Sequence, residues 1–169
     1  FDVMKDIEKG YGIRKTDPGI ALVENPEGEI EPVSMRWGFV RHFNPAINNA
    51  RSDKLEGMWK HAWESKNRCL IPMSTFYEWS GPKGNKQTHA FQSAEDGKFL
   101  WAAGLWEENE DPEIGRCYSM MTTDASEQVE AIHHRMPVLL AAENFENFLQ
   151  QENPDELLVP YPEELKIFD

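Results

Sequence analysis

The stretch RCLIPMSTFYEW, residues 68–79, carries the strongest strand pattern in the chain. Its two halves, RCLIP and TFYEW, are short runs of apolar and aromatic residues, which is typical of buried β-strands. Period-two alternation places Phe76 and Glu78 on one face of the second strand. Tyr77 and Trp79 then share the other face. Because an unpaired buried carboxylate is costly, Glu78 is either a charge at the rim of a sheet or a general acid or base tuned by its surroundings.

Further short strands and a few helices are predicted on both sides of this stretch. The strands are 20–24, 31–40, 68–72, 75–79, 88–93, 98–107 and 116–123, and the helices are 52–67, 125–134 and 142–151. Turn sequences rich in Gly, Pro, Asn and Asp separate the strands. This succession predicts one α+β domain over residues 1–169, with a mixed, mostly antiparallel β-sheet and few helices.

The first predicted helix has an apolar stripe and a start signal. Ser52 is a candidate N-cap, and the stripe consists of Leu55, Met58, Trp59, Ala62 and Trp63. The second predicted helix ends in the sequence AIHHRMP, where Pro137 stops it. Cations at a helix C-terminus are favoured by the helix dipole, which gives His133, His134 and Arg135 a purely structural explanation.

Charge is unevenly distributed along the chain. The net charge is −13, which by itself argues against nucleic acid as a partner. Residues 36–68, however, hold seven Lys or Arg against three Asp or Glu, whereas residues 107–169 hold three against sixteen. This distribution fits either a basic cleft on an acidic body or an ordinary solvated helix face.

Several classes of protein are disfavoured by the sequence. An apolar run of about 18 residues is lacking, and the N-terminus FDVMKDIEKG does not resemble a signal peptide. Cys69 and Cys117 lie in apolar strands, and the chain has no CxxC, HxxxH or HExxH spacing. We therefore expect a cytoplasmic protein without a membrane span, a disulfide scaffold, a metal or a cofactor.

Four polar segments interrupt this apolar pattern. They are INNARSD, FYEW, MMTTDAS and AIHHRMP, and together they supply Asn, Arg, Glu, Thr and His side chains. Such a set on an aromatic-rich frame is what a functional site requires.

The order of these motifs resembles a known family. MRWGFV, INNARSDKL, RCLIPMSTFYEW, AAGLWE and TTDASEQVEAIHHRMPVLL, between Met35 and Leu140, are similar to the SOS-response-associated peptidase (SRAP) family, and LLVPYPEEL resembles its C-terminal region. The resemblance implies a single SRAP domain with a barrel-like core. It also implies a DNA-damage-response protein that recognises abasic sites in single-stranded DNA and captures them covalently as a thiazolidine. In the family the nucleophile is an N-terminal cysteine, exposed when the protein removes its own initiator Met, so the enzyme class is autoproteolytic peptidase with lyase-like chemistry.

The resemblance also implies roles for individual residues. Glu78 matches the catalytic glutamate, His133 the histidine near the sugar or Schiff base, and Asn49 the asparagine that positions the reacting groups. The implied DNA-binding residues are Arg51 as a phosphate clamp, Thr122 as a phosphate or sugar contact, Phe43 in place of a wedging tryptophan, and Trp37. A tryptophan in a strand is more often a core residue, so Trp37 has both interpretations, and His134 is expected outside the site.

The sequence departs from the family pattern at its ends. It begins at Phe1 without Met-Cys-Gly-Arg, lacks the Tyr-Asn-x-Ala-Pro segment before Met35, and stops at LKIFD. We therefore expect a domain that is incomplete at both ends. If Phe1 were the true start, a noncovalent binder would be expected.

Three functions remain as alternatives. The first is covalent capture of abasic single-stranded DNA by a monomer that is nucleoid-associated when bound. The second is a noncovalent single-stranded DNA-binding module. The third, a protease acting on other proteins, is disfavoured because no Ser/His/Asp set with nucleophile-elbow spacing is evident.

Overall fold

The computed structural model describes residues 12–169. The expected departure from the family pattern at Phe1 therefore lies outside the described residues. The strands are β1 (Pro18–Glu24), β2 (Ile30–Trp37), β3 (Phe39–Arg41), β4 (Asn44–Ile47), β5 (Asn49–Arg51), β6 (Arg68–Met73), β7 (Phe76–Ser80), β8 (Gln87–Ser93), β9 (Leu100–Glu108), β10 (Arg116–Asp124), β11 (Arg135–Pro137) and β12 (Leu165–Phe168). The helices are α2 (Lys60–Glu64), α3 (Glu127–Glu130) and α4 (Phe145–Gln150), with 3₁₀ turns at Ala142–Asn144 and Asp155–Leu157. None of the helices in the described residues is long and apolar enough to cross a membrane.

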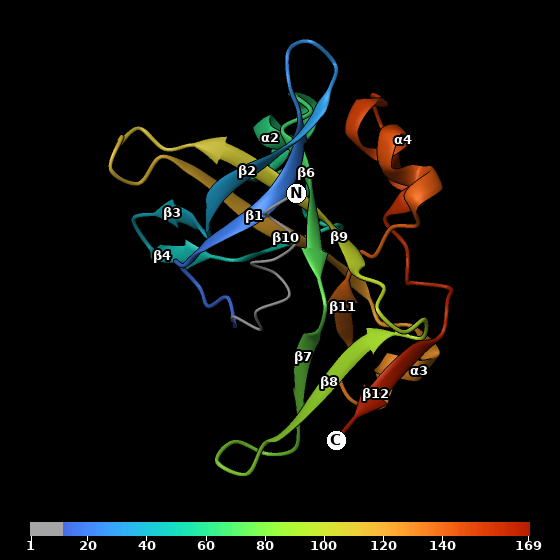
Figure 1. Cartoon of the computed structure of the whole chain (residues 1–169). Coiled ribbons are helices and arrows are strands. Elements are labelled where there is room, and N and C mark those ends of the chain that lie inside the picture. The colour runs from blue at the N-terminus through green and yellow to red at the C-terminus, as the bar shows by residue number, and fades with distance from the viewer. Residues whose placement is uncertain (1–11) are drawn as a thin grey trace.

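The larger sheet runs in the order β11-β10-β2-β1-β6-β9, and β5 adds to β10 (Figure 1). Strands β2 and β5 lie parallel to β10, whereas the other pairings are antiparallel, so the predicted mixed, mostly antiparallel sheet is confirmed. The sheet curls on itself because β9 pairs with both β6 and β10. Strands β1 and β6 meet only at Leu22 and Leu70, so the core is a curled sheet rather than a closed barrel.

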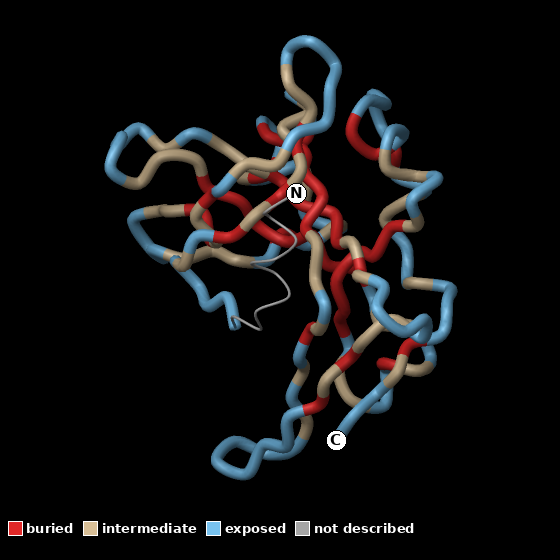
Figure 2. Tube along the Cα trace, in the orientation of Figure 1, coloured by how far each residue is buried: buried red, intermediate tan, exposed pale blue. Residues whose placement is uncertain are grey.

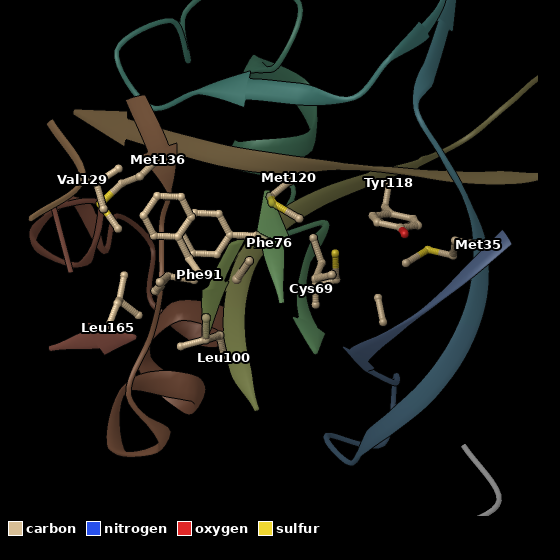
Figure 3. Packing of buried hydrophobic residues seen from close by; sticks show 14 of the residues in the cluster. Met35, Cys69, Phe76, Phe91, Leu100, Tyr118, Met120, Val129, Met136 and Leu165 are labelled. Atoms are coloured by element: carbon tan, nitrogen blue, oxygen red, sulfur yellow. The ribbon is translucent and has the colours of Figure 1, made fainter. Parts of the chain in front are cut away.

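A smaller sheet of β7, β8 and β12 projects from the larger one (Figure 1). An apolar cluster joins the two sheets, and Figure 3 shows its members side by side. Phe76 and Phe91 stack with ring centroids 4.7 Å apart. Around them pack buried residues of β9, β10, β11, α3 and β12, namely Leu100, Met120, Met136, Val129 and Leu165. Buried residues follow the centre of both sheets, and the hairpin tips are exposed (Figure 2).

The predicted strand 31–40 is wrong as a single element because the chain turns at Gly38. This glycine has a φ of +121°, and a Cβ on it would lie 3.0 Å from the Cα of Ala46. Only glycine adopts this conformation easily and permits such a close approach. The break creates the β3–β4 hairpin, which sequence periodicity did not indicate.

Two of the predicted helices are much shorter than expected. The helix predicted over 52–67 is reduced to α2, and Ser52 is not its N-cap, because the Ser52 N–H donates to the carbonyl of Thr122 and extends the pairing of β5 with β10. Trp59 and Trp63 of the predicted stripe are nevertheless buried. The helix predicted over 125–134 is reduced to α3, and Arg135 lies in β11 opposite Asp124 rather than at a helix end.

Candidate functional site

Glu78 and His133 face each other between the two sheets. Glu78 lies in β7, and His133 follows α3, with its Nδ1 atom 3.7 Å from Oε2 of Glu78. The two side chains are 21% and 33% exposed, so solvent and a substrate can reach both. Burial raises the pKa of the Glu78 carboxyl above its ordinary value, and the neighbouring His133 charge opposes part of this rise. Glu78 is therefore not simply a charge at the rim of a sheet.

The backbone of Arg135 fixes the imidazole of His133. The Arg135 N–H donates to Nδ1 at 3.1 Å, and the Arg135 carbonyl lies 3.0 Å from the same nitrogen. The neutral ring with its proton on Nε2 uses the first contact, and a ring protonated on Nδ1 uses the second. The ring also stacks on His134, with centroids 4.6 Å apart. The backbone of Arg135 thus holds the ring in one orientation whichever ring nitrogen carries the proton.

Arg135 is a site residue that the sequence interpretation assigned to a helix end. Its side chain is only 10% exposed, and its guanidinium donates to Asp124 at 2.9 Å. It also donates to the carbonyl of Thr122 at 2.8 Å and to the Thr122 hydroxyl at 3.1 Å. Thr122 is buried. The arginine therefore fixes the Thr122 hydroxyl from inside the protein.

Arg51 forms an ion pair with a nearby carboxylate of the same chain, that of Asp53. Its Nε and Nη2 atoms donate to the two carboxylate oxygens of Asp53 at 2.9 and 2.8 Å. The Arg51 hydrogen bond holds the pKa of Asp53 well below its usual range. Asp53 also lies 4.0 Å from Nη2 of Arg135, and Arg51 stands opposite Thr122 in the β5–β10 register. Two arginines, one exposed and one buried, thus converge on one acidic side chain.

Asn49 lies two residues before Arg51, exposed on the same side of β5. The chain beside it is fixed, because the Trp37 indole donates to the carbonyl of Asn48 at 3.1 Å and the Met120 N–H donates to it at 2.9 Å. Trp37 is half-buried and stacks on Tyr118 at 6.4 Å, so in this structure it supports the segment that carries Asn49.

Phe43 lies apart from this group. It is 66% exposed at the turn between β3 and β4, where its ring stands edge-on to His42. Among the described residues, no aromatic contact joins it to the other predicted site residues. The structure therefore brings Glu78 to His133 and Arg51 to Thr122 through Asp53 and Arg135, and leaves Phe43 separate.

Neither thiol in the described chain is suited to nucleophilic attack. Cys69 and Cys117 are free and buried, and burial raises the pKa of both thiols above the ordinary value. Within residues 12–169, no group of three or more His, Cys, Asp or Glu side chains could hold a metal ion. Glu78 and His133 are the facing pair of titratable side chains in this site.

The raised pKa of Glu78 predicts a pH-dependent gain in stability when this charge is removed. Below about pH 4, near the pKa of an unfolded glutamate, the carboxyl is neutral in both the folded and the unfolded chain. As the pH rises, ionising the partly buried carboxyl destabilises the folded protein. Glu78→Gln is therefore expected to have a larger free energy of unfolding than the wild type at pH 7 and an equal one near pH 4. Urea unfolding at both pH values measures this difference, and a gain that persists unchanged at pH 4 would contradict it.

Comparison with known proteins gives a consistent family. The family model described as SOS response associated peptidase (SRAP) matches residues 2–169. Abasic site processing protein YMR114C of Saccharomyces cerevisiae is 31% identical over 82% of this chain and 39% of the relative. Abasic site processing protein YoqW of Bacillus subtilis is 31% identical over 75% of this chain and 63% of the relative. The matched region thus spans 39% to 63% of the length of these relatives.

Solved structures show the same fold. A protein from Bordetella bronchiseptica superposes with a TM-score of 0.78 at 23% identity, covering 98% of this chain and 93% of the other. A protein from Bacteroides thetaiotaomicron superposes with a TM-score of 0.73 at 21% identity, covering 90% and 73%.

Proposed function

This chain belongs to the SOS response associated peptidase (SRAP) family, and on that premise we propose that it processes abasic sites in single-stranded DNA. Two relatives that are each 31% identical are named abasic site processing proteins. The observation that carries the proposal is the contact of Glu78 with His133, because an abasic sugar reacts through its ring-opened aldehyde. Attack of an amine on an aldehyde requires both a proton donor and a proton acceptor.

The raised pKa of Glu78 suits it to this proton transfer. A carboxyl with a raised pKa keeps its proton to a higher pH than an ordinary glutamate, so it is better suited to give a proton as well as take one. In the proposed reaction, an α-amine attacks the aldehyde carbon and a thiol then closes the ring. One C–N bond and one C–S bond form, and the carbon–oxygen double bond of the aldehyde breaks. The amine and the thiol each lose one proton, and the aldehyde oxygen leaves with these two protons as water. Glu78 and His133 carry the protons between these groups.

The nucleophile of the covalent route is an N-terminal cysteine with its free amine. Cys69 and Cys117 do not replace it, because both thiols are buried and have raised pKa values. The described residues supply the remainder of the site. Asn49 positions the sugar from β5, while Arg51 and Thr122 contact the backbone phosphates.

Intact-mass spectrometry of the full-length gene product tests the proposal. The protein is mixed with an abasic single-stranded oligonucleotide and then denatured. We expect a mass increase equal to one oligonucleotide minus one water, and no increase with the same oligonucleotide carrying an intact base. A protein that binds the abasic oligonucleotide more tightly without an adduct would leave only the noncovalent alternative. Equal affinity for both oligonucleotides, without an adduct, would overturn the proposal.

The ion pair between Arg51 and Asp53 predicts opposite changes in DNA affinity when either residue is replaced. Arg51→Ala removes a proposed phosphate contact, so binding is expected to weaken and its logarithmic salt slope to fall by about 1. Asp53→Asn removes the competing carboxylate that now holds the guanidinium at 2.8 Å, so it is expected to tighten binding. Fluorescence anisotropy at several salt concentrations measures both effects. Weaker binding by both variants would show that the ion pair itself, rather than a free Arg51, contacts DNA.

A further inference from the structure

A second cluster of polar side chains lies in the smaller sheet, beside Glu78 of the site described above. His89 of β8 is buried, and both of its ring nitrogens have partners. Its Nε2 atom lies 2.6 Å from the Ser80 hydroxyl, and its Nδ1 atom lies 2.7 Å from Oδ1 of Asp169. These contacts assign the tautomer, because a carboxylate only accepts. Nδ1–H donates to Asp169, and Nε2 accepts from the Ser80 hydroxyl.

Strand register brings these three residues together. In β7 and β8, Glu78 stands opposite His89 and Ser80 stands opposite Gln87, so Ser80 is the diagonal neighbour of His89 on the same face. In β12, Phe168 stands opposite Ala90. Asp169 directly follows β12 and continues this direction to reach His89. Two members of the cluster thus lie in paired strands, and the third follows the strand beside them.

We propose that Ser80, His89 and Asp169 form a second catalytic centre, in which the Ser80 hydroxyl is a nucleophile toward acyl esters. The contacts follow the order nucleophile, base and orienting carboxylate that defines a serine-hydrolase triad, which is recognised by geometry rather than by sequence position. Ser80 is partly exposed, so a small ester can reach its oxygen.

The proposed reaction has two balanced steps. The Ser80 oxygen attacks the ester carbonyl carbon, and its proton passes to Nε2 of His89. The bond from that carbon to the alcohol oxygen breaks, and Nε2 returns the proton to the departing alcohol. Water then attacks the acyl-serine through the same base, which releases the acid and restores the Ser80 hydroxyl.

The turn after Ser80 is shaped in a way that suits this chemistry. Gly81 has a φ of +91°, and a Cβ there would lie 2.8 Å from the carbonyl oxygen of Asn85. The backbone N–H that follows a nucleophilic serine is the usual donor to the developing oxyanion. Gly81 is exposed, and among the turn and loop hydrogen bonds of the described residues its N–H has no backbone acceptor, so we assign it as the donor to this oxyanion.

Covalent labelling with a fluorophosphonate probe, followed by peptide mapping, tests the proposal on the full-length protein. We expect phosphonylation of Ser80 at least tenfold above that of Ser93, a partly buried serine of β8 whose hydroxyl accepts from the Glu95 N–H. Ser80→Ala should abolish both this label and the hydrolysis of 4-nitrophenyl acetate. Ser93→Ala should change neither.

Asp169→Asn tests whether Asp169 assists catalysis or only stabilises the fold. Asp169 is 70% exposed, so its charge stabilises the imidazolium less than a buried carboxylate would, and a fall in the Ser80 labelling rate of about tenfold is expected. Labelling of Ser80 no faster than that of Ser93, or a rate unchanged in Asp169→Asn with an unchanged melting temperature, would overturn the proposal. Abasic-DNA processing by Ser80→Ala should equal that of the wild type, which keeps this result independent of the proposed DNA function.

Discussion

Replacing Glu78 with glutamine is expected to slow adduct formation on abasic DNA by about 100-fold, the usual contribution of a general acid or base. Glutamine preserves the shape of the side chain, but it cannot give up a proton. The DNA affinity should change little, because the proposed phosphate contacts come from Arg51 and Thr122. The defect should therefore appear in the rate of the chemical step.

Single-turnover kinetics with saturating protein isolate this step, and anisotropy reports the affinity separately. Glu130→Gln provides a control, since Glu130 is an exposed carboxylate of α3 on the segment that leads to His133. Wild-type rates in both variants would exclude Glu78 from the mechanism. A matched loss of rate and affinity in Glu78→Gln would instead make Glu78 a residue that shapes the DNA-binding surface.

Sequence patterns correctly predicted the strands that depend only on a few adjacent residues. Strands β6 and β7 followed from RCLIP and TFYEW, and β10 from RCYSMMTT, because buried strands need apolar or β-branched residues in short runs. The question raised by Glu78 was also local, since a carboxylate among three aromatics is unusual. Only the structure supplied its partner, His133, which is 55 positions further along the chain.

The missed features depend on contacts between distant segments. Residues 135–137 become a strand because β10 offers an edge for pairing, although the preceding histidines and the following proline suggested a helix end. Likewise, Asp53 did not suggest a functional role in the sequence, yet its carboxylate holds Arg51 and approaches Arg135. Such pairings are set by tertiary register, which sequence periodicity does not contain.

Ser52 shows how tertiary pairing overrides a local signal. The sequence after it has the spacing of an amphipathic helix, and a serine is a favourable N-cap. In the structure, the Ser52 N–H instead bonds to Thr122 of β10, and the helix begins only at Lys60. Glycine at position 57 weakens the helical alternative in between. The apolar stripe still predicted which side chains are buried, because Trp59 and Trp63 pack inward although most of the predicted helix is absent.

The largest loss of stability is expected from Arg68→Ala, which should lower the free energy of unfolding by about 3–5 kcal/mol, as when one partner of a buried charged network is removed. Arg68 begins β6 and is 1% exposed. Its guanidinium donates to the carbonyls of Phe148 and Gln151 at 2.9 and 2.6 Å. It also donates to those of Trp63 and Glu152, both at 3.1 Å.

These four carbonyls lie at or just after the ends of α2 and α4, where many helix carbonyls lack a partner within the helix, although the Trp63 carbonyl also accepts from the Lys66 N–H. Arg68 thus ties both helices to the sheet, and it also lies 4.1 Å from the centre of the Trp63 ring. Burial lowers the pKa of its guanidinium to about 10, so it remains charged at neutral pH. Alanine would remove these four hydrogen bonds and leave a cavity beside the indole.

Arg116→Ala is the matched control for this loss. Arg116 also pairs with a carboxylate, Glu108 at 2.8 Å, and lies 4.4 Å from the centre of the Trp106 ring, but its side chain is 32% exposed. Because water screens an exposed ion pair, this substitution is expected to cost less than about 1 kcal/mol. Urea unfolding of both variants compares the two arginines directly. Equal losses would mean that the helix-end carbonyls find water when Arg68 is removed, and that burial of the guanidinium contributes nothing beyond a surface pair.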